Sequence, residues 1–205
     1  VDTIPLMDPS LFNKFVSYIN SVEINSDGSL VLLDELREFT TRHAEFSDAK
    51  WAVPSGIVET LKNSMQVIQP NDITRHLWLF ENSWVRLPET SRYETHEALA
   101  IRRLEIAPDL LAAEGDALFN FVVKAGSPYA VGEVLSRHLR DPEYVISLMA
   151  LANLGIPEES ARQLIIGLSE GMSREMPEDW LSFISRLRTG LPMKCLEWIG
   201  AGLSP

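Results

Sequence analysis

Apolar side chains recur at helical spacing through almost the whole chain, and prolines divide this pattern into short segments. In the C-terminal part, the prolines stand at positions 128, 142, 157, 177 and 192. Proline suits the first turn of a helix, because its ring fixes φ and its missing N–H would have no partner there. Each segment between two prolines carries one apolar stripe, and helices this short are unstable in isolation. The sequence therefore predicts short helices that pack on one another.

The N-terminal part carries similar stripes. Behind Asp8 and Pro9, a capping residue and a first-turn proline, apolar residues follow the spacing i, i+3, i+4, i+7 at Phe12, Phe15, Val16 and Ile19. The segment EYVISLMALANLG at 143–155 is apolar on nearly all sides and is expected to lie buried between neighbouring helices. We predict an all-α fold of short antiparallel helices, stacked as an irregular bundle or as an α-solenoid-like array.

Two similar tripeptides, Gly126-Ser127-Pro128 and Gly155-Ile156-Pro157, stand 29 residues apart, each at the expected start of a helix. This spacing indicates a degenerate helix-turn-helix repeat, with an ordinary irregular bundle as the alternative. A break at Gly115 suggests an N-terminal helical subdomain, 1–115, and a C-terminal array of short helices, 116–205. One continuous domain is the alternative.

Charge and composition narrow the classes of partner. Asp and Glu outnumber Lys and Arg by 29 to 18, which gives a formal net charge of -11. This is the wrong sign for a protein that tracks phosphate backbones, so nucleic acid is not an expected partner. No apolar run reaches the roughly 18 residues needed to cross a bilayer, so a membrane is not expected either. The single cysteine, Cys195, fits a reducing cytoplasm and is expected to be a core residue.

The chain begins at Val1 rather than at an initiator methionine, and we expect it to be a piece of a larger protein. Two segments, RHLWLFENSWVRLP at 75–88 and SPYAVGEVLSRHL at 127–139, resemble helical arrays inside large bacterial multidomain proteins. Such arrays include sensor or scaffold regions attached to NTPase modules. The resemblance implies an interaction module, and it supplies no functional residues.

The stretch GLSEG at 167–171 has the spacing G-x-S-x-G of a hydrolase nucleophile elbow. That elbow needs a strand before the serine and a histidine after it, whereas Ser169 ends a helical pattern and every histidine precedes it. We interpret Gly171 instead as the residue that ends this helix in a left-handed conformation. An H-E-x-x-H zinc motif begins at His96 but has Ala100 in place of its second histidine. Phosphate-binding glycine loops are also missing, so no cofactor is expected.

The stretch EINSDGSLVLLD at 23–34 aligns with a degenerate EF-hand calcium loop. With Gly28 as the turn glycine, ligand positions 1, 3, 5, 7 and 12 fall on Glu23, Asn25, Asp27, Ser29 and Asp34. Position 1 prefers Asp and position 12 prefers a bidentate Glu, so calcium affinity should be poor. The favoured interpretation is a plain turn or a small β-hairpin within 22–32, in which 22–24 and 30–32 flank the Asp-Gly dipeptide. An EF-like loop without metal is a further alternative.

Arginine and aromatic residues are interleaved between positions 75 and 103. The candidate interface residues are Arg75, Trp78, Trp84, Arg86, Arg92, Arg102 and Arg103. Protein interfaces and phosphate sites both favour this combination. In the alternative interpretation, the tryptophans point inward and the arginines lie on a solvated helix face. If this face binds a partner, charge reversal at Arg102 and Arg103 should weaken binding and leave the fold intact.

Together these features favour a non-catalytic protein–protein interaction or scaffold module, a piece of a larger bacterial cytoplasmic protein such as an NTPase-linked sensor. The expected partner is another protein or another domain of the same parent chain. A helical domain that senses a small ligand is the first alternative, and a hydrolytic enzyme with an unrecognised site is the second. A polar cavity with perturbed carboxylates would favour the enzyme, whereas an exposed apolar or arginine–aromatic ridge would favour the module.

Overall fold

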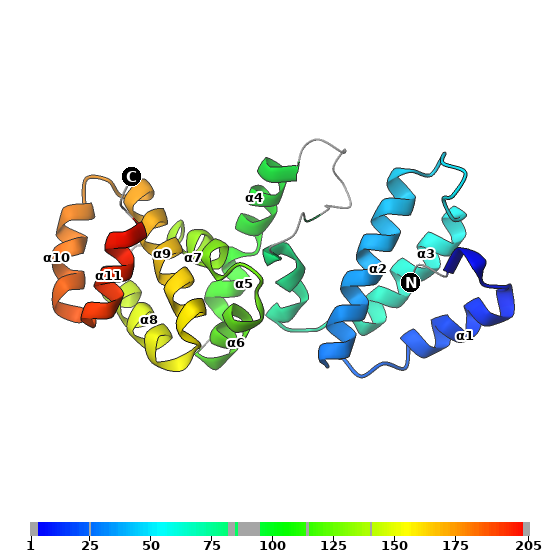
Figure 1. The fold of residues 1–205 in the computed structure, drawn as a ribbon, viewed down its shortest axis with the longest axis horizontal. Helices are drawn as coiled ribbons and strands as arrows, with labels where there is room; N and C mark the ends of the chain where they lie inside the picture. Colours follow the sequence, from blue (N-terminus) through cyan, green and yellow to red (C-terminus); the bar gives the residue numbers. More distant parts are fainter. Residues whose placement is uncertain are drawn as a thin grey trace. The chain divides into compact units, whose positions relative to one another are not determined.

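A computed structural model describes residues 4–24, 26–81, 85, 95–113, 115–139 and 141–202. Within these ranges all regular structure is helical, with eleven α-helices, two 3-10 helices and no strand (Figure 1). The predicted all-α class is therefore confirmed. None of the described helices is long and apolar enough to span a membrane. The contacts between Cα atoms divide the chain into two units. The first unit comprises Val1–Arg75 and Val85–Ala98, and the second comprises His76–Trp84 and Leu99–Pro205.

The first unit contains η1 (Ile4–Leu6), α1 (Pro9–Ile19), α2 (Asp27–Glu45) and α3 (Ser55–Ile68). Helix α3 packs against both α1 and α2. Asp8 caps α1 by accepting the backbone N–H of Leu11 at 2.9 Å, as its place before Pro9 predicts. One apolar core joins the three helices, and its buried residues are Ile4, Ile19, Leu36, Phe39, Val53, Val58, Leu61 and Ile68.

The β-hairpin predicted within residues 22–32 is wrong, because this stretch leads into α2. The side chain of Ser26 accepts the backbone N–H of Ser29 at 3.1 Å and caps the helix. Residues 27 and 28 then form the first turn of α2 rather than a turn between strands. Leu36 and Phe39, further along the same helix, are buried against the core. The local Asp-Gly signal is thus outweighed by burial along a longer helical stripe.

The second unit contains parts of η2 (Ile73–Phe80) and of α4 (Thr95–Glu105), which both cross the division of the chain. Its other helices are α5 (Ala107–Ala112), α6 (Asp116–Lys124), α7 (Pro128–Ser136), α8 (Pro142–Gly155), α9 (Glu158–Glu175), α10 (Trp180–Gly190) and α11 (Met193–Gly202). Helix α9 packs against α6, α7, α8 and α11. Phe80 of η2 and Phe121 of α6, both fully buried, meet edge to face with ring centroids 5.5 Å apart.

Prolines stand at or just before the helix starts, as predicted. Pro128 and Pro142 occupy the first turns of α7 and α8, while Pro157 and Pro192 immediately precede α9 and α11. Pro177 lies three residues before α10. The two similar tripeptides therefore introduce α7 and α9, which pack against each other.

The break predicted at Gly115 is the short connection between α5 and α6. Gly115 has a φ of 49°, a left-handed backbone conformation that favours glycine. It lies within the second unit, so the predicted subdomains 1–115 and 116–205 do not coincide with the division by contacts.

Glycines allow the backbones of α7 and α9 to approach closely. A Cβ atom added at Gly132 of α7 would collide with the backbone of α9 at Leu164. A Cβ atom added at Gly167 of α9 would collide with the carbonyl group of Tyr129 on α7. The absence of side chains at both positions is therefore a condition for this helix crossing.

The same crossing explains the stretch GLSEG. Its two glycines are four residues apart and so lie on one face of α9, where a Cβ atom added at Gly171 would collide with the Ser136 side chain. Our interpretation of Gly171 as a helix end is wrong, because α9 continues to Glu175. Ser169 is fully buried inside this helix and donates its hydroxyl hydrogen to the Ile166 carbonyl at 3.0 Å. Close packing, rather than a cap, accounts for the glycines.

Candidate functional site

Helix α8 exposes apolar side chains along one side. The opposite side is buried as expected, but Tyr144, Leu151 and Leu154 are 46%, 55% and 82% exposed. These three residues, called here the α8 face, lie within one sector of the helix because their spacing is i, i+7, i+10. The prediction that this segment is buried between neighbours is therefore wrong for one side. Among the described residues, α8 makes its main helix contacts with α9 and α10.

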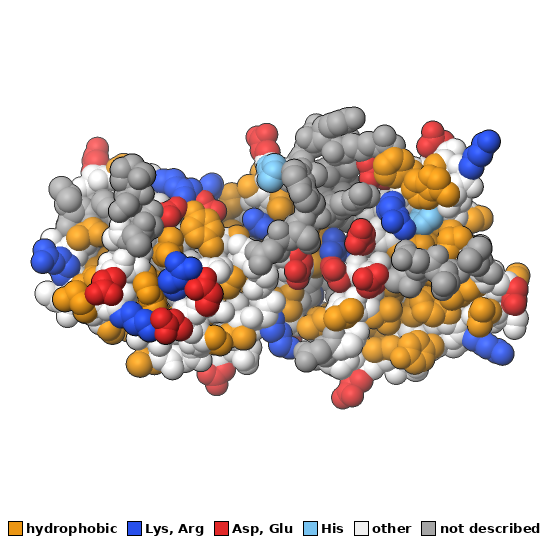
Figure 2. Space-filling view, viewed as in Figure 1, with side chains coloured by type: hydrophobic (Ala, Val, Ile, Leu, Met, Phe, Trp, Pro, Cys, Tyr) orange, Lys and Arg blue, Asp and Glu red, His pale blue; other side chains and the backbone are white. Residues whose placement is uncertain are grey.

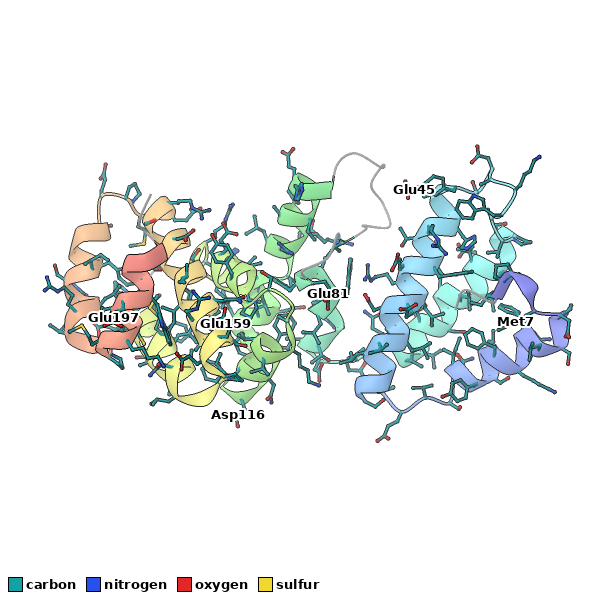
Figure 3. The ribbon with its side chains drawn as sticks, in the orientation of Figure 1. Met7, Glu45, Glu81, Asp116, Glu159 and Glu197 are labelled. Atoms are coloured by element: carbon teal, nitrogen blue, oxygen red, sulfur yellow. The ribbon has the colours of Figure 1, made fainter. Side chains whose placement is uncertain are left out.

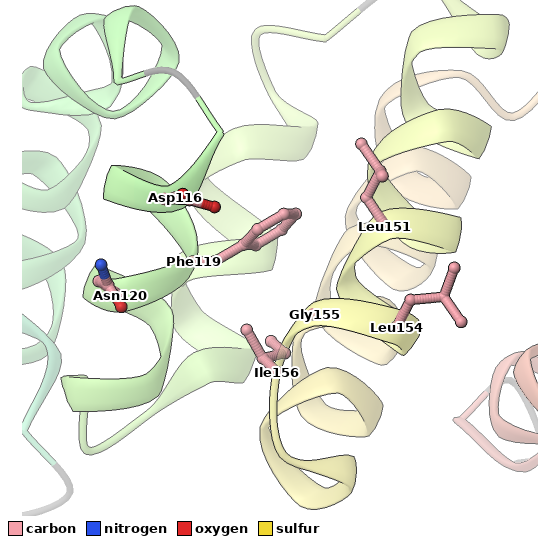
Figure 4. A pocket seen from close by; sticks show the side chains of 7 residues that line it. All are labelled: Asp116, Phe119, Asn120, Leu151, Leu154, Gly155 and Ile156. Atoms are coloured by element: carbon pink, nitrogen blue, oxygen red, sulfur yellow. The ribbon is translucent and has the colours of Figure 1, made fainter.

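A groove borders the α8 face on the side of α6. It encloses about 410 Å³ and is lined by Asp116, Phe119, Asn120, Leu151, Leu154, Gly155 and Ile156. Figure 4 shows Phe119 projecting from α6 toward α8, with Ile156 between the two helices where α8 ends. Hydrophobic side chains also gather over α1 in the first unit (Figure 2). Leu11 and Tyr18 of α1 are exposed. The α8 face borders the groove described above.

Gly155 shapes the floor of the groove. It is the last residue of α8, and a Cβ atom placed on it would lie 3.7 Å from the Phe119 ring, in ordinary van der Waals contact. The ring of Phe119 therefore rests close to the end of α8. Ile156 follows directly with an extended backbone, which turns the chain toward α9. Phe119, Gly155 and Ile156 thus bring apolar groups together where α8 ends.

Among the lining residues that the structure describes, the polar side chains belong to α6. Asp116 lies in the first turn of α6 and Asn120 one turn later, so both stand on the same side of the helix. Figure 3 marks Asp116 at the outer end of α6. Among the described residues, neither side chain has an ion pair or hydrogen bond within the protein, and none of the lining residues is Lys or Arg. The rim is therefore acidic and can accept hydrogen bonds.

This chemistry suits binding better than catalysis. General acid–base catalysis uses a positioned proton donor or acceptor, usually with a second polar group that orients it. The described lining offers one titratable group, Asp116, set beside an amide and four apolar side chains. An apolar surface with an acidic rim can bury the apolar side chains of another molecule and pair with a cation at its edge.

The arginine–aromatic residues divide into several groups. Trp84, Arg86 and Arg92 lie outside the described residues. Arg75 belongs to the first unit, whereas Trp78, Arg102 and Arg103 belong to the second. Trp78 is half-buried on η2, and Arg102 is exposed on α4, where its guanidinium pairs with Glu105 at 2.7 Å. The interface proposed for these residues stays a prediction, with Arg102 as its clearest surface member.

Arg103 has a structural role that the sequence did not indicate. Its Nε donates a 2.6 Å hydrogen bond to the carbonyl of Leu79, and its guanidinium lies 5.3 Å from the centre of the Phe80 ring. Burial lowers the pKa of Arg103, and the charge of Glu133 opposes that shift. Because this side chain ties α4 to η2, we now expect charge reversal at Arg103 to destabilise the fold, whereas Arg102 keeps the earlier expectation.

The EF-hand loop is not formed. Asp27, Ser29 and Asp34 lie in the first turns of α2, and a helix cannot wrap its side chains around a cation as a loop does. The Ser29 hydroxyl donates to the Ser26 carbonyl at 2.8 Å, and Asp34 pairs with Arg37. Glu23 precedes the helix, and Asn25 lies outside the described residues. Within the part of the chain that the structure describes, no group of three or more His, Cys, Asp or Glu could hold a metal ion.

A polar network joins α7 and α9 beside the glycine crossing. Tyr129 donates to Glu170 at 2.6 Å, and Arg174 donates to Glu133 at 2.5 Å and to Glu170 at 3.2 Å. The hydrogen bond to Glu133 is the main cause that raises the pKa of Arg174. Only the i, i+4 spacing of Glu170 and Arg174 could have signalled this network from the sequence. Because these hydrogen bonds join side chains of α7 to side chains of α9, we interpret the network as a structural connection.

Cys195 is buried, as predicted, and burial raises the pKa of its thiol. A thiol of raised pKa is a poor nucleophile near neutral pH, because the thiolate is the reactive form. Cys195 therefore acts as a small core residue of α11.

No protein-family model matches this chain, and searches of curated proteins and of solved structures give no significant match. The geometry of the α8 face and its groove is therefore the basis on which a function can be argued.

Proposed function

We propose that this chain is a non-catalytic protein–protein interaction module and that a partner protein docks on the α8 face and in the adjoining groove. The observation that carries the proposal is the exposure of Leu151 and Leu154 beside a groove that presents both apolar and polar groups. Exposed apolar side chains are ordinary when scattered, but a grouped and concave set is typical of a docking site. In the larger context that the sequence resemblance implies, the module would serve as a scaffold or sensor region of a bacterial cytoplasmic protein.

The free energy available from this surface is substantial. Complete burial of a leucine side chain contributes about 1.5–3 kcal/mol. Most of that remains available at Leu154, which is 82% exposed, and roughly half remains at Leu151, which is 55% exposed. A micromolar complex needs about 8 kcal/mol in total. The two leucines would thus supply a central part of the binding free energy, as anchor residues do at protein interfaces.

Photo-cross-linking from the α8 face tests the proposal. Tyr144 would be replaced by the photoreactive amino acid benzoylphenylalanine, which keeps an aromatic ring at that place. We expect a discrete cross-linked product in lysate of the source organism, and we expect it to be lost when Leu154→Glu is added. The matched control carries the same amino acid in place of Tyr18, which is 65% exposed on α1 of the first unit.

Equal product from both positions, or a product that persists with Leu154→Glu, would contradict docking on the α8 face. A second control, Met193→Glu, introduces the same charge at a side chain of α11 that is 71% exposed. It should leave the cross-link unchanged. A small ligand would instead bind within the groove and protect the chain from thermal unfolding without giving a protein product.

A further inference from the structure

We infer that the segment that docks on the α8 face is an amphipathic helix with a basic residue placed opposite Asp116. This inference rests on the proposed function, because it specifies the partner of the same groove. Two properties of the groove carry it, namely the type of element that forms its walls and the sign of the charge on its rim.

The walls favour a helical partner. Both are α-helices, whose backbone N–H and C=O groups bond to each other within α6 and α8 except at the helix ends, so neither wall offers an open row of backbone groups. An extended segment gains affinity mainly by adding to the open edge of a sheet, and no such edge is present in the described residues. A helix satisfies its own backbone and can lay an apolar stripe against Tyr144, Leu151 and Leu154, a length of about 15 Å along α8.

The rim favours a basic partner. Asp116 lines the groove without an ion pair among the described residues, and Asn120 beside it can accept a further hydrogen bond. The whole chain carries a formal net charge of -11, which adds a long-range attraction for cations. A lysine or arginine next to the apolar stripe of the docking helix would pair with Asp116. A second copy of this acidic chain, or an anionic bilayer, is a poorer match in charge.

A displayed library of helical peptides tests the inference. Each peptide would carry leucines at i, i+3, i+7 and i+10, and mixtures of Lys, Glu, Gln and Ala at the other positions. The bait is the whole chain, compared with Leu154→Glu, Asp116→Lys and Asp116→Asn. Glu197→Lys is the matched charge control, because Glu197 lies on α11, which packs against α9 and α10 rather than against the groove (Figure 3). The Kd of the best peptide is then measured by fluorescence polarisation.

The expected result is enrichment of peptides with lysine at one fixed place beside the leucines. Asp116→Asn should raise the Kd of such a peptide by roughly two- to fivefold, as for an exposed ion pair. Asp116→Lys should raise it further and shift the enrichment toward glutamate, and Glu197→Lys should leave both unchanged. Thermal unfolding of each bait confirms that the variants are folded.

Peptides that require Leu154 but show no preference for lysine would overturn the charge inference and leave the proposed function standing. Peptide binding that Leu154→Glu does not weaken would overturn the docking helix. The proposed function would then be decided separately, by whether Leu154→Glu abolishes the cross-link formed from position 144. Dimerisation of the bait that Leu154→Glu abolishes would also overturn the inference, because a second copy would be the occupant.

Discussion

The hydroxyl group of Tyr129 on α7 donates a 2.6 Å hydrogen bond to the carboxylate of Glu170 on α9. Burial first, and then this hydrogen bond, raise the pKa of Tyr129 to about 12. The folded protein therefore favours the protonated hydroxyl. The contribution of the protonated Tyr129 hydroxyl to the stability of the fold is fully present below the ordinary tyrosine pKa near 10. This contribution is lost as the pH rises from there toward the pKa of Tyr129 in the folded protein, about 12.

We predict that Tyr129→Phe removes this alkaline loss of stability. The free energy of unfolding of the natural chain should fall with pH above about 10 more steeply than that of Tyr129→Phe. Urea denaturation at a series of alkaline pH values measures the difference. Tyr144→Phe, at an exposed site on α8, is the control and should retain the slope of the natural chain. Parallel slopes for Tyr129→Phe and the natural chain would contradict the assigned role of this hydroxyl.

The glycine crossing predicts a second effect. Gly167→Ala should destabilise the protein by about 1–3 kcal/mol or more, because the new methyl group would collide with the backbone at Tyr129, which cannot rotate away. Gly200→Ala on α11 is the control, since nothing lies within 4 Å of its added Cβ atom. It should leave the stability unchanged or raise it by up to about 1 kcal/mol. Thermal unfolding would refute the close crossing if the two variants behaved alike.

A third prediction concerns acid pH and the first unit. His43 is buried, its Nδ1 accepts the backbone N–H of Val53 at 3.0 Å, and the Phe39 and Trp51 rings contact it. Burial first, and then the charge of Arg42, lower the pKa of His43 below 6.5. The fold favours the neutral His43 ring. The contribution of this ring to the free energy of unfolding is therefore present above pH 6.5 and is lost as the pH falls through the lowered pKa of His43.

We therefore expect the stability of the natural chain to decline with acidification below pH 6.5, and His43→Gln to weaken this dependence. Glutamine offers an oxygen that can still accept the Val53 N–H but does not titrate. Near-ultraviolet circular dichroism, which senses the packing of Trp51, can follow unfolding at each pH. His96→Gln, at an exposed site on α4, should behave as the natural chain does. An unchanged acid dependence in His43→Gln would assign it to other groups.

The fourth prediction separates two neighbouring arginines. Arg103→Ala should cost about 1.5–3 kcal/mol, because it removes a charged hydrogen bond to Leu79 in a partly buried place. Arg102→Ala should cost no more than about 0.5 kcal/mol, since its pair with Glu105 is exposed. Urea denaturation of both variants provides the test, and equal costs would contradict the contrast. Partner binding should therefore be probed with Arg102 variants only.

The helical architecture was predictable because it rests on local rules. Pro128 and Pro142 stand in first turns, and Asp8 caps α1, because these preferences operate within a few residues. The start of α2 was missed where two local signals compete, an Asp-Gly turn and a Ser26 cap. Burial of Leu36 and Phe39 decides between them, and that burial depends on residues distant in the chain.

The groove itself was less accessible from sequence. The apolar character of 143–155 was evident, but periodicity cannot say which side of such a helix lacks a neighbour. Phe119 and Leu151 line the same groove although 32 positions separate them in the sequence, and no local pattern links them. The glycines of GLSEG gave a visible signal, yet their meaning depended on Gly132 in another helix.

The close crossing of α7 and α9 also affects how the groove can respond to a ligand. Helix α6 packs against both α7 and α9, and α8 packs against α9, so both walls pack against α9, one partner of that crossing. The glycines fix the register of that pair, because sliding by one residue would bring side chains into backbone contact. The groove is thus preorganised, and a ligand that fits it should bind with little entropic penalty from ordering the receptor.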